Sequence, residues 1–279
     1  MIKANNITKI YGKQKAVNGL NLNIEKGMSY ALLGPNGAGK TTTMKILSSL
    51  IEANEGEVYI DGEIMSRQNK RIKEELGMVS QHFSLQREMT PVEALTLHGK
   101  LHKMPSKEIK TKVDELLTFA QMDKDKGKLI GKLSGGNKRK LMIIRAVMHS
   151  PKILFLDEPT VGLDATIRRS IWDLLRRLKN EGLTIILTTH YIEEASVLCD
   201  KIGMMSEGKI LAEDSPSGFM TKIDPFTVES FEGGITNYNY FASREEAGAY
   251  GASLGVDTLI RETNLEDVYI KYTSKKLQK

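Results

Sequence analysis

Apolar side chains recur along the chain in two alternating patterns, one typical of short strands and one typical of amphipathic helices. The strand-like runs are Ile2–Ile10, Ala16–Ile24, Ser29–Leu33, Val58–Ile60, Gly77–Ser80, Ile153–Leu156 and Thr184–Thr188, with a hairpin at Ile202–Met205 and Lys209–Ala212. The helical stretches are Lys40–Leu50, Pro91 to about Gln121, Asn137–His149 and Thr166–Asn180. Apolar strands that alternate with helices predict an α/β fold with a mainly parallel sheet covered by helices.

The same pattern divides the chain into parts. Thr90 followed by Pro91 is a favourable N-cap and first helical position, and it opens a long helical region. After about Gly218 the pattern changes. The segments that follow are a strand at Phe226–Phe231, a helix near Ser243–Leu254, a strand at Thr258–Arg261 and a helix at Leu265–Tyr272. We therefore predict a main domain over residues 1–220 with a helical subdomain at about 82–150, and a small α+β extension over residues 221–279.

Composition narrows the class of protein. Of 279 residues, 40% are apolar, which is enough to build a packed core. Unbroken apolar runs reach only four residues, as in Ile153–Leu156, whereas a membrane span needs about 20. The N-terminal residues show no apolar signal-peptide region, and the single cysteine, Cys199, allows neither an internal disulfide nor a cysteine-built metal site. We expect a soluble, cytosolic chain.

The net charge is +5, and it is unevenly distributed. The last 60 residues carry 7 basic and 9 acidic side chains, so the basic excess belongs to the first part of the chain. Such an excess fits an ordinary solvated surface, an anionic ligand, a nucleic acid or the face of an anionic membrane. No long basic run, zinc-finger spacing or aromatic-rich nucleic-acid motif accompanies it, so we do not expect a nucleic-acid partner.

A phosphate-binding loop follows the third predicted strand. The pattern G-x-x-x-x-G-K-S/T is met in full by Gly34, Pro35, Asn36, Gly37, Ala38, Gly39, Lys40 and Thr41. The glycines allow backbone N–H groups to point inward at phosphate oxygens, and the N-terminus of the following helix favours negative charge. We expect Lys40 to contact the β- and γ-phosphates and the hydroxyl of Thr41 to face Mg²⁺.

Two adjacent carboxylates, Asp157 and Glu158, follow the apolar run Ile153–Leu156. In an open parallel sheet the ligand binds at the carboxyl ends of the strands, which is where these side chains stand. We therefore expect Asp157 to orient Mg²⁺, directly or through water, and Glu158 to polarise an attacking water molecule.

Between these motifs lies Leu133-Ser134-Gly135-Gly136-Asn137, which opens a predicted helix. In this order, the motifs of residues 1–215 resemble the ATP-binding cassette family, the ATPase subunits of ABC transporters. The resemblance implies a P-loop ATPase core with a mainly parallel sheet, an antiparallel β subdomain and an α-helical subdomain. It also implies hydrolysis of ATP with Mg²⁺.

The resemblance assigns roles residue by residue. Tyr11 stands where the family has an aromatic ring that stacks on adenine, although a lone tyrosine is more often a packing residue. Thr42 extends the phosphate loop, and Gln81 resembles the glutamine that reaches Mg²⁺ and the attacking water. His190 resembles the switch histidine that contacts the γ-phosphate. Ser134, Gly135 and Gly136 form the signature motif, and Gly162, Leu163 and Asp164 resemble the D-loop.

The sequence departs from the family pattern at two positions. Asn137 replaces the usual glutamine that ends the signature motif, and Ala165 follows the D-loop where proline is common. The run Asn137-Lys138-Arg139-Lys140 is similar to the branch of drug and lipid exporters. The segment Thr263–Ile270 also resembles a short domain late in that branch, although it can equally be a closing amphipathic helix.

The family resemblance implies partners. One ATP on the phosphate loop would be capped by the signature motif of a second ATPase subunit, so that a head-to-tail homodimer or heterodimer forms. The chain would serve a separate integral-membrane permease, most simply an exporter, at the cytoplasmic face of the membrane. The alternatives are the ATPase subunit of an importer, or a soluble ABC ATPase that acts on nucleic acid or ribosomes. Ribosome-acting members carry two cassettes and DNA-clamp members a long coiled coil, and this chain shows neither.

Overall fold

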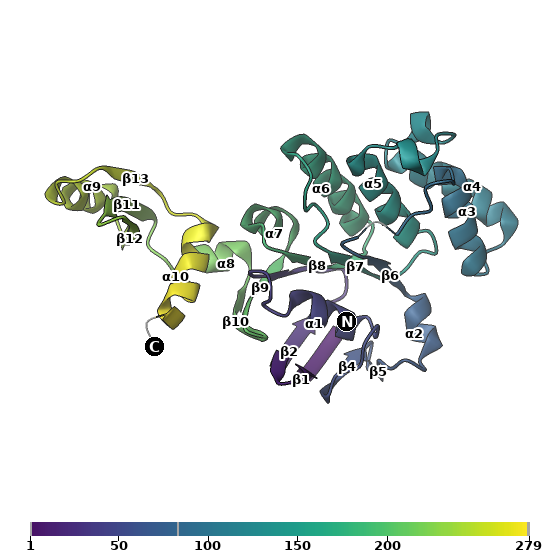
Figure 1. The fold of residues 1–279 in the computed structure, drawn as a ribbon, viewed down its shortest axis with the longest axis horizontal. Coiled ribbons are helices and arrows are strands. Elements are labelled where there is room, and N and C mark those ends of the chain that lie inside the picture. The colour runs from purple at the N-terminus through teal and green to yellow at the C-terminus, as the bar shows by residue number, and fades with distance from the viewer. Residues whose placement is uncertain (1, 83, 278–279) are drawn as a thin grey trace.

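The computed structural model describes residues 2–82 and 84–277, and its centre is a six-stranded sheet (Figure 1). The strand order is β10 (Lys209–Asp214), β9 (Lys201–Ser206), β3 (Ser29–Leu33), β8 (Thr184–Thr189), β7 (Ile153–Asp157) and β6 (Leu76–Val79). Every neighbouring pair is parallel except the β9–β10 hairpin. The predicted α/β fold with a mainly parallel sheet is confirmed.

The central strands are apolar because both faces of the sheet are covered. Every residue of β3, β7 and β8 is buried. Since successive side chains of a strand point to opposite faces, Tyr30 and Leu32 join one core, and Ala31 and Leu33 join the other. The core that contains Ala31 and Leu33 lies between the sheet and the helices α5 (Gly135–Ala146), α6 (Ala165–Asn180) and α7 (Ile192–Leu198). The core that contains Tyr30 and Leu32 lies on the other face, against α1 (Lys40–Leu47) (Figure 1).

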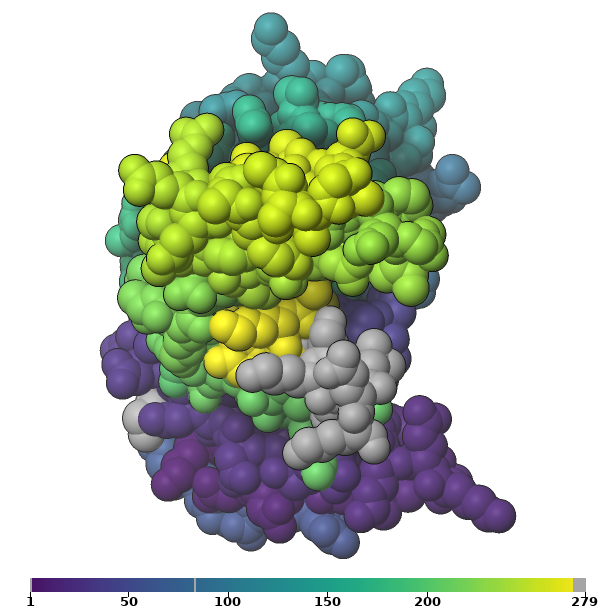
Figure 2. Space-filling model, turned by 90° about the vertical axis from the view of Figure 1, so that its left-hand side faces the viewer, coloured from purple at the N-terminus to yellow at the C-terminus, as the bar shows by residue number. Residues whose placement is uncertain are grey.

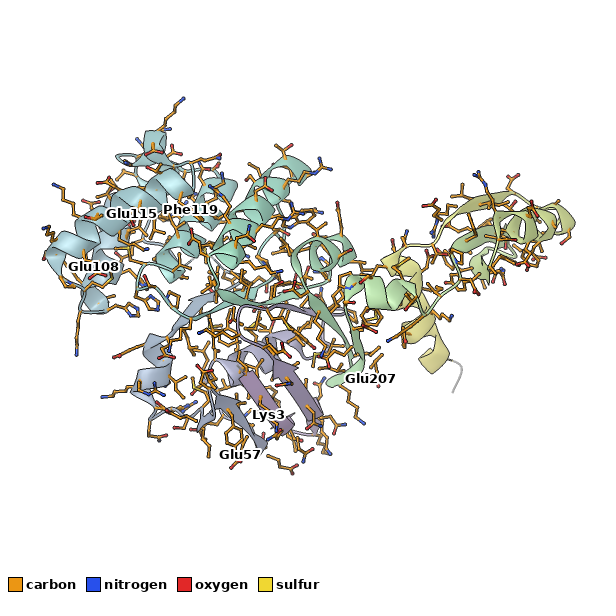
Figure 3. All side chains as sticks on the ribbon, turned by 180° about the vertical axis from the view of Figure 1, so that it is seen from behind. Lys3, Glu57, Glu108, Glu115, Phe119 and Glu207 are labelled. Carbon is orange, nitrogen blue, oxygen red and sulfur yellow. The ribbon has the colours of Figure 1, made fainter. Side chains whose placement is uncertain are left out.

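A second, antiparallel sheet covers the α1 side of the central sheet. Its order is β2 (Gln14–Ile24), β1 (Ile2–Tyr11), β4 (Glu55–Ile60) and β5 (Glu63–Ile64). Ile2 pairs with both Ile24 and Ile60, and all three side chains are buried against the central sheet. Lys3 and Glu57 stand on the opposite, solvent-facing side (Figure 3). The antiparallel β subdomain implied by the family resemblance is therefore present.

The helical region predicted from Pro91 to about Gln121 is present, and it consists of two helices. α3 (Pro91–Leu101) begins with a capping box between Thr90 and Glu93, and α4 is Ser106–Phe119. Lys103 has a φ of 57°, which cannot continue a helix, and Pro105 directly precedes α4. Glu108 and Glu115 face solvent on α4 (Figure 3), whereas its aliphatic residues are buried and Phe119 is half-buried.

Four elements of five to seven residues escape the sequence pattern, and so does the two-residue strand β5. The four are α2 (Lys70–Glu74), α7, α8 (Pro216–Met220) and β12 (Ile235–Phe241). Two single turns of 3₁₀ helix, Asp123–Asp125 and Ile130–Lys132, lead from α4 to α5. Elements of five to seven residues contain too few apolar positions for a helical or strand period to stand out. Among the described residues, no helix is both long enough and apolar enough to span a bilayer.

The C-terminal segment forms its own three-stranded sheet, in the order β12, β11 (Phe226–Glu232) and β13 (Thr258–Glu262), with α9 (Arg244–Ser253) packed against it. Figure 2 looks at the molecule from this end, and the segment occupies the middle of that face. The last helix, α10 (Leu265–Leu277), returns to the main core, where Leu265 and Val268 are buried. The domain division at residue 220 stays a prediction.

Candidate active site

The glycine-rich loop from Gly34 to Gly39 joins the buried strand β3 to α1. A Cβ at Gly34 would collide with the carbonyl oxygen of Met205, and one at Gly39 would collide with the carbonyl oxygen of Ala16. Gly39 also has a φ of 101°, a conformation that side chains disfavour. The loop is thus held between β2 and the β9–β10 hairpin, with room only for glycine at these two positions.

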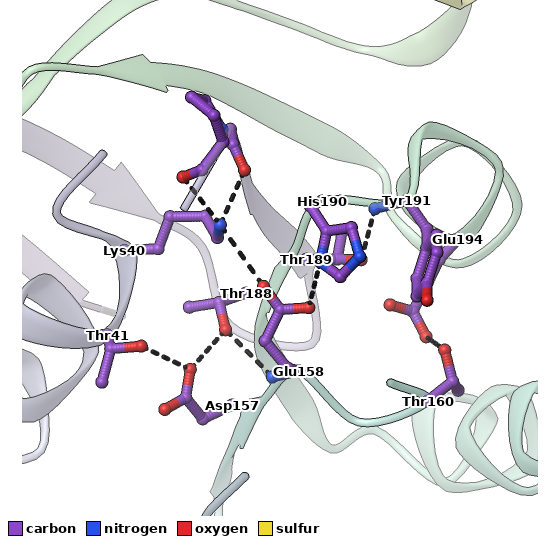
Figure 4. Close-up of polar contacts among 12 residues, drawn as sticks. Lys40, Thr41, Asp157, Glu158, Thr160, Thr188, Thr189, His190, Tyr191 and Glu194 are labelled. Carbon is purple, nitrogen blue, oxygen red and sulfur yellow. Dashed lines mark hydrogen bonds and ion pairs between the residues drawn. The ribbon is translucent and has the colours of Figure 1, made fainter. Parts of the chain in front are cut away.

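Lys40 is buried, and its ammonium group is held inside the loop. Its Nζ donates to the carbonyl oxygen of Gly34 at 2.6 Å and to that of Pro35 at 3.1 Å. The same Nζ lies 3.3 Å from Oε1 of Glu158 (Figure 4). The positive charge therefore sits at the point where the sequence motif places the β- and γ-phosphates.

Thr41, Asp157 and Thr188 are joined by hydrogen bonds across three elements. Thr41 Oγ1 donates to Asp157 Oδ1 at 3.0 Å, and Thr188 Oγ1 donates to the same oxygen at 2.6 Å (Figure 4). The hydroxyl and the carboxylate that the sequence predicts as magnesium ligands thus lie side by side. Oxygen ligands of this kind are those that Mg²⁺ prefers, and the pair fits the ion.

Glu158 has the least ordinary backbone of the site. Its φ of 47° lies in the left-handed region, which is rare for a residue with a side chain. The conformation is held because the N–H of Glu158 donates to the backbone oxygen of Thr188 at 3.2 Å and to its Oγ1 at 3.0 Å. Strained residues of this kind gather at functional sites, and here the strain turns the carboxylate toward Lys40.

His190 follows β8 and meets the same carboxylate. Its Nδ1 lies 2.9 Å from Glu158 Oε2, and its ring is partly exposed. The sequence separation is 32 residues, so only the parallel pairing of β7 with β8 brings the two side chains together. The histidine and the carboxylate predicted as catalytic are therefore in direct contact.

A pocket of about 250 Å³ opens beside these groups. Of the predicted site residues, it is lined by Tyr11, Pro35, Asn36, Gly37, Gly39, Lys40, Thr41, Thr42, Gln81 and Glu158. Tyr11 is 50% exposed, so its ring is free to stack on a planar ligand. Gln14 and Ala16 of β2 also line the pocket, and sequence reasoning missed both because no motif marks them.

The signature motif lies outside this pocket. Ser134 is exposed and caps α5, with its Oγ accepting from the N–H of Asn137 at 3.2 Å. Gly135 and Asp164 are also exposed, and Asp164 caps α6 by accepting from Ile167 N. Gly136, Ala38 and Gly34 are predicted site residues that do not line the pocket either. The two halves of the predicted nucleotide site thus lie on separate parts of one chain.

Asn137 uses its side chain for structure. Its Nδ2 donates to Asp125 Oδ2 at 2.6 Å, which connects the start of α5 to the first of the two 3₁₀ turns, Asp123–Asp125. The residue that replaces the family's usual glutamine thus has a structural contact of its own, and Ser134 and Gly135 are exposed.

Arg139 connects α5, the helix that the signature motif opens, to the backbone around Glu158. The sequence analysis gave this residue no role. Its guanidinium is buried and donates to the carbonyl oxygens of Pro159 at 2.5 Å and Ser80 at 2.8 Å, and also to that of Glu158. Burial lowers the pKa of the guanidinium, and the nearby carboxylates of Glu194, Asp157 and Glu158 oppose that shift. One side chain therefore fixes the residues before Gln81 and after Asp157 relative to α5.

We expect Arg139→Leu to lower the free energy of unfolding by about 2–4 kcal/mol, because several buried carbonyls would lose their donor. Urea denaturation followed by circular dichroism measures this. Arg169→Leu is the matched control, since Arg169 is exposed on α6 and its replacement should change stability by less than about 0.5 kcal/mol. Equal losses for the two variants would show that the Arg139 contacts carry no special weight.

Comparisons with known proteins agree with this geometry. Residues 17–161 match the sequence model of a family described as ABC transporter. The chain belongs to the ABC transporter family. It is 34% identical to the Nod factor export ATP-binding protein I of Burkholderia lata, over 98% of this chain and 97% of that protein. It is 35% identical to the linearmycin resistance ATP-binding protein LnrL of Bacillus subtilis, over 82% of this chain and 73% of that protein.

Solved structures lead to the same family. A dimeric ATP-binding cassette in a post-hydrolysis state, bound to ADP and Pi, covers 77% of this ABC chain with a TM-score of 0.70 and 30% identity; 98% of that structure is matched. A structure of the ATP-binding subunit of an ABC transporter matches 98% of this chain and 99% of its own length, with a TM-score of 0.74 and 22% identity. This match supports the fold of the whole chain, including the C-terminal segment. This ABC protein is a transporter ATPase subunit of the exporter type, as the sequence predicted. The importer and soluble alternatives are not favoured.

Proposed function

We propose that this ABC ATPase powers export through a separate membrane permease, at the cytoplasmic face of the membrane, by ATP-driven closure of a head-to-tail dimer. The observation that carries the proposal is the separation of the two half-sites. The phosphate loop lines a pocket, whereas Ser134 and Gly135 are exposed outside it. A second copy, or a related subunit, would supply the missing donors from the N-terminus of its α5.

The pocket residues fit ATP and Mg²⁺. Thr41, Asp157 and Gln81 would hold the ion, which neutralises charge on the β- and γ-phosphates when it is bound. Lys40 would turn from the loop carbonyls to the phosphates, because a phosphate oxygen is a stronger acceptor for an ammonium group than a carbonyl is. That movement would also release Oε1 of Glu158, which the Lys40 ammonium faces at 3.3 Å in the present arrangement.

Glu158 would then take the proton of the attacking water as the water oxygen bonds to the γ-phosphorus and the bond to ADP breaks. His190 would hold the carboxylate through Oε2 and present its ring to the γ-phosphate. Tyr11 would stack on the adenine. Hydrolysis removes the phosphate that both subunits contact, so the closed dimer loses stability and opens.

Co-expression with a membrane protein from a neighbouring gene tests this proposal. With a tag on the ATPase alone, we expect a polytopic membrane protein to co-purify and the complex to hydrolyse ATP. The Glu158→Gln variant should co-purify equally well but without that activity, because assembly does not need hydrolysis. Recovery of the ATPase alone, or with ribosomes or nucleic acid, contradicts the transporter proposal.

A further inference from the structure

Three histidines meet at the end of the central sheet opposite to the nucleotide pocket. His98 and His102 lie one turn apart near the end of α3, and His149 follows α5. Leu76, the first residue of β6, lies against His149. None of these four residues lines the nucleotide pocket. The cluster is thus separate from the ATPase machinery.

The rings are packed closely enough to share a ligand. The centroids of His102 and His149 are 3.8 Å apart with the rings stacked, and those of His98 and His102 are 4.6 Å apart. One ring nitrogen of each histidine lies within 4.8 Å of the corresponding atoms of the other two. Histidines spaced i, i+4 on one helix face are a common arrangement for binding a metal ion.

The hydrogen bonds select which nitrogens are free. Nε2 of His149 lies 3.1 Å from the carbonyl oxygen of Leu76, which can only accept, so Nε2 carries the proton. Nδ1 of His149 is then an unprotonated acceptor, buried and without a hydrogen-bond partner among the described residues. Nε2 of His98 is likewise buried and without such a partner. A histidine whose second nitrogen donates to a backbone carbonyl is the usual form of a metal ligand.

The surroundings keep the rings neutral. Burial lowers the pKa of both His98 and His149 to about 4, and the neighbouring histidines add to the shift; Arg145 adds to that of His98. Burial also lowers the pKa of His102, and the carboxylate of Glu74 opposes that change. Neutral imidazole is the form that binds metals.

We propose that His98 Nε2, His149 Nδ1 and one nitrogen of His102 bind a divalent transition-metal ion of the Zn²⁺ class. Bonds of about 2.0–2.1 Å would place the nitrogens roughly 3.3 Å apart, so the rings, whose nitrogens lie within 4.8 Å of one another, would have to turn toward the ion. Three imidazoles suit Zn²⁺, Cu²⁺ or Ni²⁺ and leave a further position for water.

That further position would open into a neighbouring pocket of about 430 Å³, which His102 and His149 line. The charged side chains of this pocket are Lys70, Lys73, Glu74 and Lys103. The lysines repel a free cation and favour an anionic fourth ligand. Among the described residues that line this pocket, Glu74 is the one carboxylate. The metal would join α3 to the loop after α5 and, through Leu76, to the edge strand of the sheet.

Metal titration of the full-length, tag-free chain tests the proposal. We expect calorimetry to give one Zn²⁺ per chain, and Co²⁺ to produce the visible absorption of a four-coordinate site. His102→Gln should weaken Zn²⁺ binding by about 10–100-fold or more. It is the first variant to make because His102 is less buried than the other two histidines and the fold should survive its replacement. His82→Ala is the matched control, since His82 is exposed and outside the cluster.

His98→Gln provides a second test, with circular dichroism to confirm folding. Both cluster variants should lose the Co²⁺ absorption, and His82→Ala should keep it. Zn²⁺ should also raise the thermal midpoint of the wild-type chain and not that of His102→Gln. Absence of Co²⁺ absorption and of Zn²⁺ heat in the wild-type chain overturns the proposal. So does a folded His102→Gln chain that binds Zn²⁺ as the wild type does.

Discussion

Replacing Glu158 by glutamine lowers the rate of ATP hydrolysis by about 10²–10⁴ and leaves ATP binding in place. Glutamine has the same shape as glutamate, so it can keep a contact with His190, which lies 2.9 Å from Oε2. It cannot accept the proton of the attacking water. Single-turnover release of phosphate from the purified chain measures the effect, and calorimetry with ATP measures the affinity.

Glu181→Gln is the matched control, because Glu181 is exposed at the end of α6. This control variant should hydrolyse ATP at the wild-type rate.

Slow hydrolysis by Glu158→Gln should also preserve the closed dimer, so light scattering should show this variant as a dimer in ATP. Adding Ser134→Arg to this variant should prevent that dimer. Wild-type hydrolysis by Glu158→Gln means that another group activates the water.

Replacing Lys40 by alanine weakens ATP binding by about 10²–10³-fold, since a buried ammonium group makes hydrogen bonds to phosphate that are worth about 1.5–3 kcal/mol each. The loss has a second cause in this structure. Glu158 is buried 3.3 Å from the ammonium, so its carboxylate would face the incoming phosphates without a compensating charge. Calorimetry with ATP and with ADP measures the change, and the loss should be larger for ATP.

Lys45→Ala separates this effect from a general loss of positive charge. Lys45 is exposed in the last turn of the same helix, so its replacement should leave both affinities within about twofold of wild type. A Lys40→Ala chain that binds ATP normally would remove Lys40 from the binding site, whatever the sequence motif suggests.

The parts of the fold that could be predicted are those whose signal is local. Ser29–Leu33 is a strand with the predicted bounds, because four apolar residues directly before a glycine-rich loop have few other interpretations. The phosphate loop and the two acids at the end of β7, Asp157 and Glu158, are each read from adjacent residues, and the structure brings them together. β12 escaped because Ile235–Phe241 lacks a regular alternation of apolar and polar residues, and none of its residues is buried.

The contacts that complete the site could not be read from sequence, because they join distant segments. Arg139 donates to Ser80 across 59 positions, and its neighbours Lys138 and Lys140 look equally suited to such a role. Gln14 reaches the pocket only because β2 lies beside the loop. The break between α3 and α4 has one signal in the sequence, Pro105, and one that the sequence does not announce, the left-handed conformation of Lys103.

Neighbouring strands enclose the glycine-rich loop on both sides. Gly34 is enclosed by Met205, and Gly39 is enclosed by Ala16, so the surrounding strands define the loop's path. The conformational entropy of that segment is therefore lost when the chain folds, at about 1–2 kcal/mol per residue, and not when the nucleotide binds. ATP meets a preorganised cradle, and more of the free energy of its contacts remains for closing the dimer.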